Sequence, residues 1–458
     1  MVTTLTIWAI LPLVACEPSA PIRVGAPRDT DAEETGMVTG AEVRIHEVIG
    51  SIPVVSWTQA TEANSWIEYS YDEGEWHQSP KKSRSAGEAE ELALGVPYEL
   101  DVTLRIHWTK GDDSGQSNEL TIQTDKAPSG APEVMSVSGD ETLWDPSTPF
   151  VLTSIYGNSP TVDGSWTFII DRQGRLVWSL EAAPSRLTLH SQGSYDGTEI
   201  LIDQNSFWST FDLGAQSQVW RVKIDGSVVK RVATPYAHHP FTEMPDGSIA
   251  WAAADHYYND SIMTVDPQGK VSTVWECADF HDSIGETEYC GANTLYWHEP
   301  TQSFLFSVYS TDSIIEVDLA SGQATRWFGS LAGAYTFDPA DSKFYWQHGV
   351  HYTDAGTLLV STRSGKYDEE TVVREFQIDE VNQTLTEVWS FGEGLDVYGH
   401  EMGEAEFLPN GNILHNYGTT PRIREGTPSG EVVWDVRWNA DFIGRHTPLG
   451  NLYALAPE

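Results

Sequence analysis

The sequence predicts an all-β protein in which a six-bladed β-propeller follows a smaller β-sandwich. Two repeated phrases carry this prediction, and each combines short apolar strands with turn residues at a spacing of about 50 residues. A repeat of this length that contains several short strands is typical of β-propellers. Aromatic residues make up 11% of the chain and no long helical period is present, which agrees with an all-β fold.

The first phrase is a polar head residue, an apolar strand, a glycine turn and a second apolar strand. It is clearest in GHEMGEAEFLPNGNILHNYG, where Asn410-Gly411 separates two apolar runs. This dipeptide predicts a hairpin, because both turn positions must tolerate positive φ. The head residues are His190, His239, Asn293, His348 and His400, so the steps between them are 49, 54, 55 and 52 residues.

The second phrase is an apolar strand, often with Asp and Gly, that ends in a tryptophan. Five copies end at Trp178, Trp275, Trp327, Trp389 and Trp434. A sixth copy, around Asp225, lacks its tryptophan. Six copies predict six blades, which we assign to residues 128–458.

Composition excludes two classes of partner. Lys and Arg number 26 and Asp and Glu number 67, so the formal net charge is −41. A chain this acidic repels nucleic acid and lacks a basic face for binding a membrane surface.

The first 16 residues resemble a bacterial lipoprotein signal. A short apolar run, Leu5 to Leu13, is too short to span a bilayer and ends in Leu-Val-Ala-Cys. The resemblance implies acylation of Cys16 and a lipid-anchored place in the cell envelope, periplasmic or at the surface. The outer membrane is favoured because Glu17 follows the cysteine. The alternative is a buried N-terminal strand with a chance cysteine.

Residues 17–40 and 41–127 are predicted to be a tether and a β-sandwich. The first segment is acidic and rich in Pro, Ala and Thr, so it cannot bury enough apolar surface to fold. The second alternates polar and apolar residues with period two. Its segment LALGVPYELDVTLRI resembles the tyrosine corner of fibronectin type III domains. The resemblance implies that the Tyr98 hydroxyl bonds back to the backbone near Leu94. Ala127 to Pro132 is the predicted linker.

Two cysteines remain if Cys16 is lipidated. Cys277 and Cys290 lie 13 residues apart, and an even pair in an oxidising compartment predicts a disulfide. The competing hypothesis is a metal site made by these cysteines and His281, although the spacing matches no known zinc signature.

The repeated histidines indicate a functional channel. Equivalent positions of successive blades face one central cavity, so the histidine heads are predicted to share it: His190, His239, His348 and His400. A buried cluster of imidazoles is costly unless it serves an anion or a metal. The alternative is a solvated channel whose histidines only bond to neighbouring strands.

From about Phe150 to Tyr453, including the closing RHTPLGNLYAL, the chain resembles the bacterial arylsulfate sulfotransferase family. The resemblance rests on the head histidine, the Pro-Asn/Asp-Gly turn and the Asp-Gly-Trp phrase. It implies a six-bladed propeller that moves a sulfuryl group from a phenolic sulfate ester to a phenol. It also implies a sulfohistidine intermediate, ping-pong kinetics and no nucleotide or other cofactor.

Only some of the family's site residues have counterparts in this chain. His239 matches the first family histidine, and His348 best matches the nucleophile, with His400 as the competing assignment. Asn293 matches the family's asparagine, and His190 joins it as a predicted substrate contact. Gly291 and Tyr309 stand where the family has a histidine and an arginine. Arg363, one blade later, is expected to substitute for that arginine.

Three hypotheses follow. The first is a lipid-anchored enzyme acting on a phenolic sulfate donor and a phenol acceptor, favoured by His239, His348, His400 and Arg363. The second is an inactive propeller that binds an anionic or aromatic ligand, favoured by Gly291 and Tyr309. The third is a surface adhesion lipoprotein in which both modules mediate interactions.

Overall fold

The computed structural model describes residues 36–458 except 73, 211, 255–258, 368–369 and 457–458. The predicted signal and most of the tether lie outside these residues. The described chain is built of strands, and its helical elements are short: α1 (Phe207–Thr210), α2 (Cys277–Ile284), η1 (Glu299–Thr301), η2 (Tyr309–Thr311) and η3 (Leu452–Leu455). The prediction of an all-β chain is confirmed. Among the described helices, none has the length and apolar character needed to cross a membrane.

The N-terminal part consists of two sheets that share one core. The first sheet is β1 (Val38–Ile45), β2 (Pro53–Gln59) and β6 (Gly87–Leu92). The second is β4 (His77–Gln78), β3 (Ala63–Ser70), β7 (Asp101–Lys110) and β8 (Asp113–Gln116), with β5 (Lys82–Arg84) on β3 and β9 (Leu120–Gln123) on β7. Trp57 of the first sheet packs with Ile67 and Leu104 of the second in a single buried cluster. The two sheets therefore lie face to face.

Six further sheets follow. The first is β13 (Leu176–Glu181), β12 (Val162–Asp171), β11 (Phe150–Ser159) and β35 (Phe442–Leu449). The second is β14 (Ser191–Gly193), β15 (Ile200–Gln204), β16 (Gln218–Val222) and β17 (Val228–Ala233). The third is β18 (Ala237–Glu243), β19 (Ile249–Ala254), β20 (Asp260–Val265) and β21 (Val271–Glu276). The fourth is β22 (Ala292–His298), β23 (Ser303–Val308), β24 (Ser313–Asp318) and β25 (Gln323–Gly329).

The last two sheets carry one extra strand each. The fifth is β27 (His348–Tyr352), β28 (Leu358–Arg363), β29 (Thr371–Asp379) and β30 (Thr384–Phe391), with β26 (Thr336–Asp338) parallel to β30. The sixth is β31 (Glu404–Phe407), β32 (Ile413–Asn416), β33 (Arg422–Gly426) and β34 (Val432–Trp438), with β10 (Val134–Gly139) on β34. The six copies of the second phrase fall in six different sheets.

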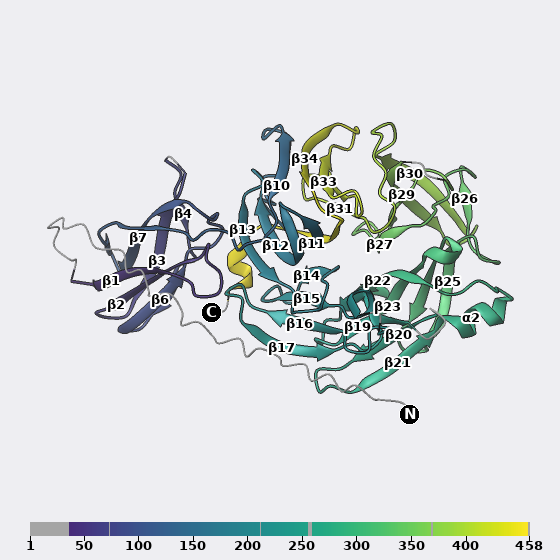
Figure 1. Cartoon of the computed structure of the whole chain (residues 1–458), viewed down its shortest axis with the longest axis horizontal. Coiled ribbons are helices and arrows are strands. Elements are labelled where there is room, and N and C mark those ends of the chain that lie inside the picture. Colours follow the sequence, from purple (N-terminus) through teal and green to yellow (C-terminus); the bar gives the residue numbers. More distant parts are fainter. Residues whose placement is uncertain (1–35, 73, 211, 255–258, 368–369, 457–458) are drawn as a thin grey trace, which may run out of the picture.

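The six sheets follow one another around a common centre (Figure 1). The first strands of neighbouring sheets meet there, because β18 contacts β22, β22 contacts β27 and β27 contacts β31. The C-terminal β35 completes the innermost position of the first sheet and contacts β14. The predicted hairpin turns are present, with φ of 81°, 76° and 87° at Gly247, Gly356 and Gly411.

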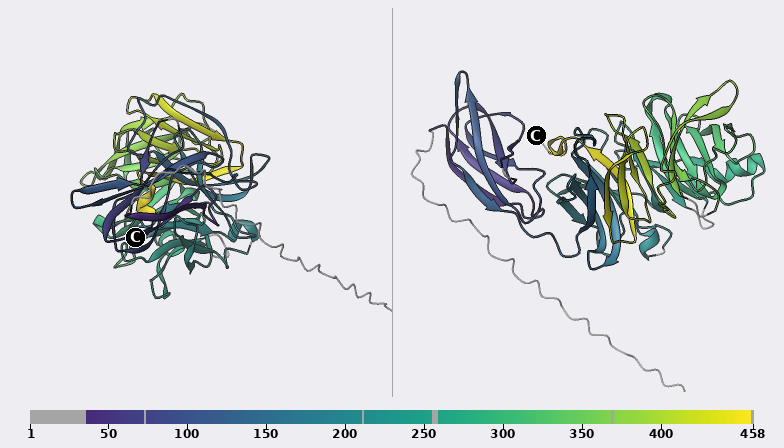
Figure 2. Two further views of the ribbon diagram at one scale, coloured as in Figure 1. Left: turned by 90° about the vertical axis from the view of Figure 1, so that its left-hand side faces the viewer. Right: turned by 90° about the horizontal axis from the view of Figure 1, so that it is seen from above.

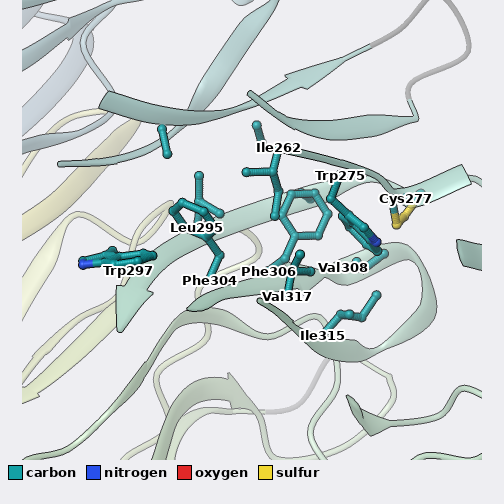
Figure 3. Close-up of a cluster of buried hydrophobic side chains, with 14 of the residues drawn as sticks. Ile262, Trp275, Cys277, Leu295, Trp297, Phe304, Phe306, Val308, Ile315 and Val317 are labelled. Carbon is teal, nitrogen blue, oxygen red and sulfur yellow. A yellow bond between two sulfur atoms is a disulfide. The ribbon is translucent and has the colours of Figure 1, made fainter. Parts of the chain in front are cut away.

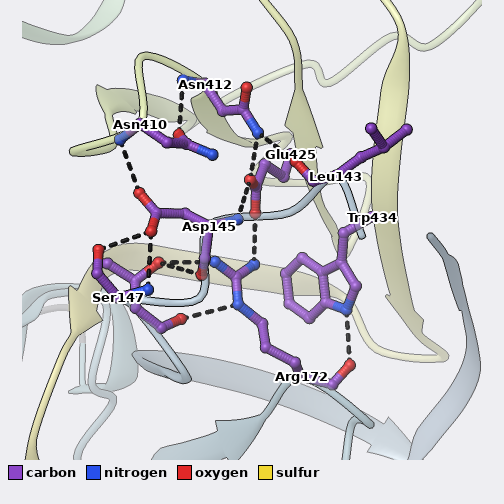
Figure 4. A network of polar contacts seen from close by, with 9 residues as sticks. Leu143, Asp145, Ser147, Arg172, Asn410, Asn412, Glu425 and Trp434 are labelled. Atoms are coloured by element: carbon purple, nitrogen blue, oxygen red, sulfur yellow. Dashed lines mark hydrogen bonds and ion pairs between the residues drawn. The ribbon is translucent and has the colours of Figure 1, made fainter. Parts of the chain in front are cut away.

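A buried polar network joins the first and last sheets (Figure 4). Arg172, which follows β12, forms an ion pair with Glu425 of β33 at 2.8 Å. The Glu425 carboxylate also accepts hydrogen bonds from the Asp145 backbone N–H at 2.7 Å and from Asn412 Nδ2 at 2.6 Å. Trp434 Nε1 donates to the Arg172 carbonyl at 2.7 Å. Segments more than 200 residues apart in sequence are thus held together where the ring of sheets closes.

Apolar cores fill the space between neighbouring sheets. Between the third and fourth sheets, Ile262, Trp275 and Phe306 pack in one cluster that includes both sulfur atoms of the cysteine pair (Figure 3). Such closely packed interiors hold strand ends in fixed positions, and the residues that face the centre are carried on those ends.

The N-terminal sheets are packed against the rest of the chain, with η3 between them (Figure 2). Ile49, Ile52 and Leu94 share a buried cluster with residues of the first and second central sheets. The tyrosine-corner expectation is wrong in its hydrogen bond, because the Tyr98 hydroxyl lies 3.2 Å from Ser179 Oγ of β13. The reason is that Tyr98 lies at this interface, where its backbone N–H also donates to the Leu176 carbonyl at 3.2 Å.

Candidate active site

A cavity of about 390 Å³ lies where the inner strands meet, next to a small pocket of about 20 Å³. His239, Asn293 and His348 line both spaces, together with Leu189 and Met402. We call the two spaces together the central cavity. Its larger part has an aromatic wall formed by Trp208, Tyr289, Tyr309, Trp346 and Phe442. The cavity therefore offers imidazole and amide groups at one side and apolar rings at the other.

His348, the first residue of β27, has a defined tautomer. Its Nδ1 lies 3.0 Å from the Trp346 carbonyl oxygen. Because a carbonyl only accepts, Nδ1 must carry the proton, which leaves the lone pair of the neutral ring on Nε2. Burial lowers the pKa of His348 to about 4, and the charges of Arg363 and His400 act in the same direction. The ring is thus a neutral imidazole near pH 7.

His239 belongs to a row of three polar side chains. His239 Nδ1 lies 2.9 Å from His238 Nδ1, and His238 Nε2 lies 3.1 Å from Asp260 Oδ1. Burial, and then the neighbouring His238 and His348, hold the pKa of His239 well below its usual value. The central cavity therefore contains two neutral imidazoles, from repeat positions that are separated by that of Asn293.

Asn293 and His190 add hydrogen-bonding groups. Asn293 Nδ2 donates to the Gln347 carbonyl at 2.7 Å, and its buried Oδ1 has no protein partner among the described residues. His190 directly precedes β14 and lines the small pocket. Burial, together with the charge of Arg445, holds the pKa of His190 well below its usual value. The predicted grouping of His190, His239, Asn293 and His348 is thus present in one cavity.

Arg445 is a cavity residue that the sequence did not single out. It lies on β35 and lines the small pocket with the histidines. Its Nε donates to Glu404 Oε1 at 2.6 Å. Burial disfavours ionisation of Glu404, but the charge of Arg445 prevails and holds the pKa of that carboxyl below its usual value. The signal was the closing RHTPLG segment, since a C-terminal strand that completes a ring occupies an innermost position.

Arg363 lies behind the cavity. Its guanidinium carbon is 4.4 Å from the centre of the Trp346 ring and 5.3 Å from that of Tyr398. Its Nη2 donates to the His400 carbonyl at 3.0 Å. It is not among the residues described as lining the cavity, although its charge helps to lower the pKa of His348.

His400 lies at the rim and is exposed. Its ring centre is 5.7 Å from that of Trp346, and its Nδ1 is 3.4 Å from Glu401 Oε1. The reason is a shift in register. His239 and His348 precede their turn glycines by eight residues, whereas His400 precedes Gly411 by eleven. The residue eight before Gly411 is Gly403, and Gly403 does line the small pocket.

Two tyrosines fill the space above Gly291. A Cβ atom added to this glycine would lie 2.8 Å from Tyr289 Cε2 and 2.9 Å from Tyr309 Cε1. The two hydroxyls are 3.1 Å apart. Burial, followed by the hydrogen bond with Tyr289, raises the pKa of Tyr309. Gly291 and Tyr309 stand where the resemblance implies a histidine and an arginine, and the two tyrosine rings fill the space that a side chain at position 291 would need.

The predicted disulfide is confirmed. Cys277 and Cys290 are joined, with their Cα atoms 6.0 Å apart. The bond ties α2 to the segment that carries Tyr289, Gly291 and Asn293. His281 Nε2 lies 3.6 Å from Cys290 Sγ, so the three residues of the competing metal hypothesis are close together, but the sulfur atoms are bonded to each other.

The sequence model of the Arylsulfotransferase (ASST) family matches residues 120–443. This is more than half of the chain, and the protein therefore belongs to the arylsulfotransferase family. Membership implies, in general terms, an aryl sulfate donor and a phenol acceptor. Among curated proteins, no sequence matches this chain.

Several solved structures are similar at low sequence identity. TolB from Acinetobacter baumannii is 10% identical, with 77% of this chain and 80% of that chain covered and a TM-score of 0.46. A protein of unknown function from Bacteroides caccae is 15% identical, with 64% and 97% covered and a TM-score of 0.43. An inactive virginiamycin B lyase from Staphylococcus aureus, solved with quinupristin, is 13% identical, with 69% and 99% covered and a TM-score of 0.41. Likenesses with TM-scores below 0.5 do not bear on the fold or the function.

Proposed function

We propose that the protein is a nucleotide-independent arylsulfotransferase that forms a sulfohistidine at His348. The observation that carries the proposal is the hydrogen bond from His348 Nδ1 to the Trp346 carbonyl. It leaves the Nε2 lone pair as the reactive one in a cavity whose wall is aromatic. Neutral imidazole is a competent nucleophile near pH 7, and an aromatic wall suits a phenyl ring.

The reaction has two displacements at sulfur. In the first, the Nε2 lone pair of His348 forms an N–S bond while the S–O bond to the donor breaks, and the phenolate leaves with the electron pair. In the second, the acceptor phenol oxygen attacks sulfur, its proton passes to a base, and the N–S electron pair returns to Nε2. Like phosphoryl transfer, each step depends on positioning and on stabilising the charge of the sulfuryl oxygens.

The remaining cavity groups supply those contacts. Arg445 lines the small pocket with the histidines, and we assign to it the role of the family arginine that was expected of Arg363. Asn293 and His190 are proposed as further contacts to sulfuryl oxygens. Arg363 supports the site indirectly, because it stacks on Trp346, whose carbonyl orients His348. We assign His400, which lies at the rim, the role of a contact to the entering substrate.

The architecture that we propose follows from the sheets. The six central sheets are the blades of a six-bladed β-propeller at residues 128–458, closed by β35 in the first blade and by β10 in the last. The two N-terminal sheets form a fibronectin type III-like sandwich, which was predicted at residues 41–127 but begins at Val38, the first residue of β1. The predicted tether of residues 17–40 is shortened accordingly, and residues 17–37 are proposed as a tether from acylated Cys16, which would anchor the protein in the bacterial cell envelope, with the outer membrane favoured.

The test is transfer from 4-nitrophenyl sulfate to phenol. We expect release of 4-nitrophenolate by the wild type and no release by His348→Ala, with unchanged activity in a control variant, His298→Ala, at the outer end of β22. Quenching the enzyme with donor alone should add the mass of one sulfuryl group to the peptide that holds His348.

Modification of His400 instead would overturn the assignment of His348 as nucleophile. A second function is favoured by Gly291 and Tyr309, which stand where the resemblance implies a histidine and an arginine. If the folded wild type shows neither transfer nor modification, the protein binds an aromatic or anionic ligand without turning it over. An adhesive role would then be tested by binding to surfaces or partner proteins.

A further inference from the structure

The row of side chains behind His239 consists of residues to which no role has been assigned. Asp260 is the first residue of β20, and His238 and His239 are adjacent on β18. Asp260 is 2% exposed and His238 is 5% exposed, so water does not compete for their hydrogen bonds. The second Asp260 oxygen accepts the backbone N–H of Ala292, which fixes the carboxylate from the other side. Only the far end of the row, His239, reaches the central cavity.

We propose that Asp260 and His238 form a proton relay that sets the tautomer of His239 and makes its Nε2 the base for the acceptor phenol. Asp260 and His238 act as positioning residues, while His239 is the group that touches substrate. This inference rests on the proposed arylsulfotransferase function and adds to it how the acceptor loses its proton.

The tautomers follow from the contacts. The Asp260 carboxylate accepts, so His238 Nε2 carries a proton toward it. In the relay as proposed, His238 carries no second proton, and its Nδ1 is then an acceptor. His239 Nδ1 lies 2.9 Å away and must donate to it. The lone pair of neutral His239 is therefore on Nε2, as in triads where a carboxylate sets the imidazole that does the chemistry.

Counting protons shows what the row can do. It has three places for a proton: between Asp260 and His238, between the two Nδ1 atoms, and at Nε2 of His239. The proposed resting row holds two protons, so the third place is empty. When it is filled, the new positive charge is shared along the row with the Asp260 carboxylate.

The relay acts in the second displacement. As the acceptor oxygen bonds to sulfur and the His348 N–S bond breaks, the phenol proton moves to His239 Nε2. The proton then passes to the departed phenolate or to solvent, which restores the row. The first displacement with 4-nitrophenyl sulfate needs no such help, because 4-nitrophenolate is a weak base that leaves without a proton.

The discriminating variant is Asp260→Asn. An asparagine keeps the acceptor for the Ala292 N–H but turns an N–H toward His238 Nε2, so His238 must hold its proton on Nδ1. His239 then accepts at Nδ1 and carries its own proton on Nε2, where it can no longer act as a base. We expect steady-state transfer to phenol to fall by at least about 100-fold, the scale of general base catalysis. The burst of 4-nitrophenolate without acceptor should keep its amplitude and its rate within about twofold.

The matched control is Asp266→Asn, which makes the same change in the turn that follows β20, where the carboxylate accepts from the Gln268 and Lys270 backbones. Both the burst and the turnover of this variant should equal those of the wild type. Nitrogen-15 spectra of histidine-labelled protein, with His239→Gln to assign the signal among the 14 histidines, give a readout without substrate. They should show the His239 proton on Nδ1 in the wild type and on Nε2 in Asp260→Asn.

The outcomes distinguish failure of the proposed relay from failure of the proposed arylsulfotransferase function. Equal loss of burst and turnover in Asp260→Asn would overturn the relay, because it would show a disturbed site rather than a lost base. Unchanged turnover, or an unchanged His239 tautomer, would overturn it as well. A wild type without any burst would instead reject the arylsulfotransferase function, whatever the tautomer spectra show.

Discussion

At the scale of single residues, the site depends on which nitrogen of each imidazole bears a proton. The Trp346 carbonyl fixes this for His348 through a single hydrogen bond, and in the proposed relay the Asp260 carboxylate fixes it for His239 through His238. Such partners are invisible in a sequence, because Trp346 precedes His348 by two residues in a turn while Asp260 comes from another strand. The histidines themselves were predictable from the repeat, but their tautomers required the structure.

The pKa of His348 gives a pH prediction. Because the protonated ring has no lone pair on Nε2, the burst rate with 4-nitrophenyl sulfate should stay constant as the pH falls to about 5 and then drop, with a midpoint near the pKa of about 4. Stopped-flow measurement of the burst checks this. A midpoint near 6.5, the ordinary value for histidine, would show that the ring is not buried as the structure has it.

Unfolding must be followed alongside that titration. The pKa of His348 and that of His446 are lowered to about 4, mainly by burial. Between pH 6.5 and 4 these two rings bind more protons in the unfolded chain than in the folded chain, so their contribution to stability falls as the pH is lowered. Circular dichroism at each pH defines the range in which the burst reports chemistry rather than unfolding.

At the scale of elements, β35 closes the ring of sheets and carries Arg445 into the cavity. Its neighbour Gly444 allows this position. A Cβ atom there would lie 2.1 Å from Ser154 Oγ and 2.2 Å from the Leu189 carbonyl oxygen. The strand can lie this close to its neighbours only because residue 444 has no side chain.

Gly444→Ala should therefore lower the free energy of unfolding by about 1–3 kcal/mol, the usual range for overpacking a well-filled interior. It should also slow transfer, because the displaced strand moves Arg445. Denaturant melts and the 4-nitrophenyl sulfate assay measure the two effects. Gly193→Ala on β14, where an added Cβ meets nothing within 4 Å, is the control. Equal stability of the two variants would contradict the close approach.

The elements also show what the sequence could predict. The glycine turns and the tryptophan strands were predictable because hairpins and alternating strands are local patterns. The position of His400 at the rim was not predictable. Three extra residues before its turn shift the register, and a single sequence does not reveal where an inner strand begins. Arg445 was missed because it belongs to no repeat copy, although its strand completes the first sheet.

At the scale of the whole molecule, the prediction concerns anchoring. We expect Cys16→Ser to abolish acylation and to move the protein from the membrane fraction to the soluble fraction, because the acyl chain on Cys16 is the proposed anchor. Fractionation and mass spectrometry of the mature N-terminus check this. Ala15→Gly, next to the proposed lipidation site, is the control and should stay membrane-bound. An unmodified Cys16 in the wild type would contradict the proposal.

The tyrosines that cover Gly291 also constrain how this site can change over generations. A histidine introduced at position 291 alone would collide with both rings, so it would harm the fold before it could help the chemistry. An arginine placed at 309 would remove only one of the two rings, because Tyr289 Cε2 would still lie 2.8 Å from an added Cβ atom. Reversion to a site with both family side chains therefore requires positions 289 and 309 to change before position 291. The three positions are coupled, and a histidine at 291 should be tolerated only when both tyrosines have been replaced.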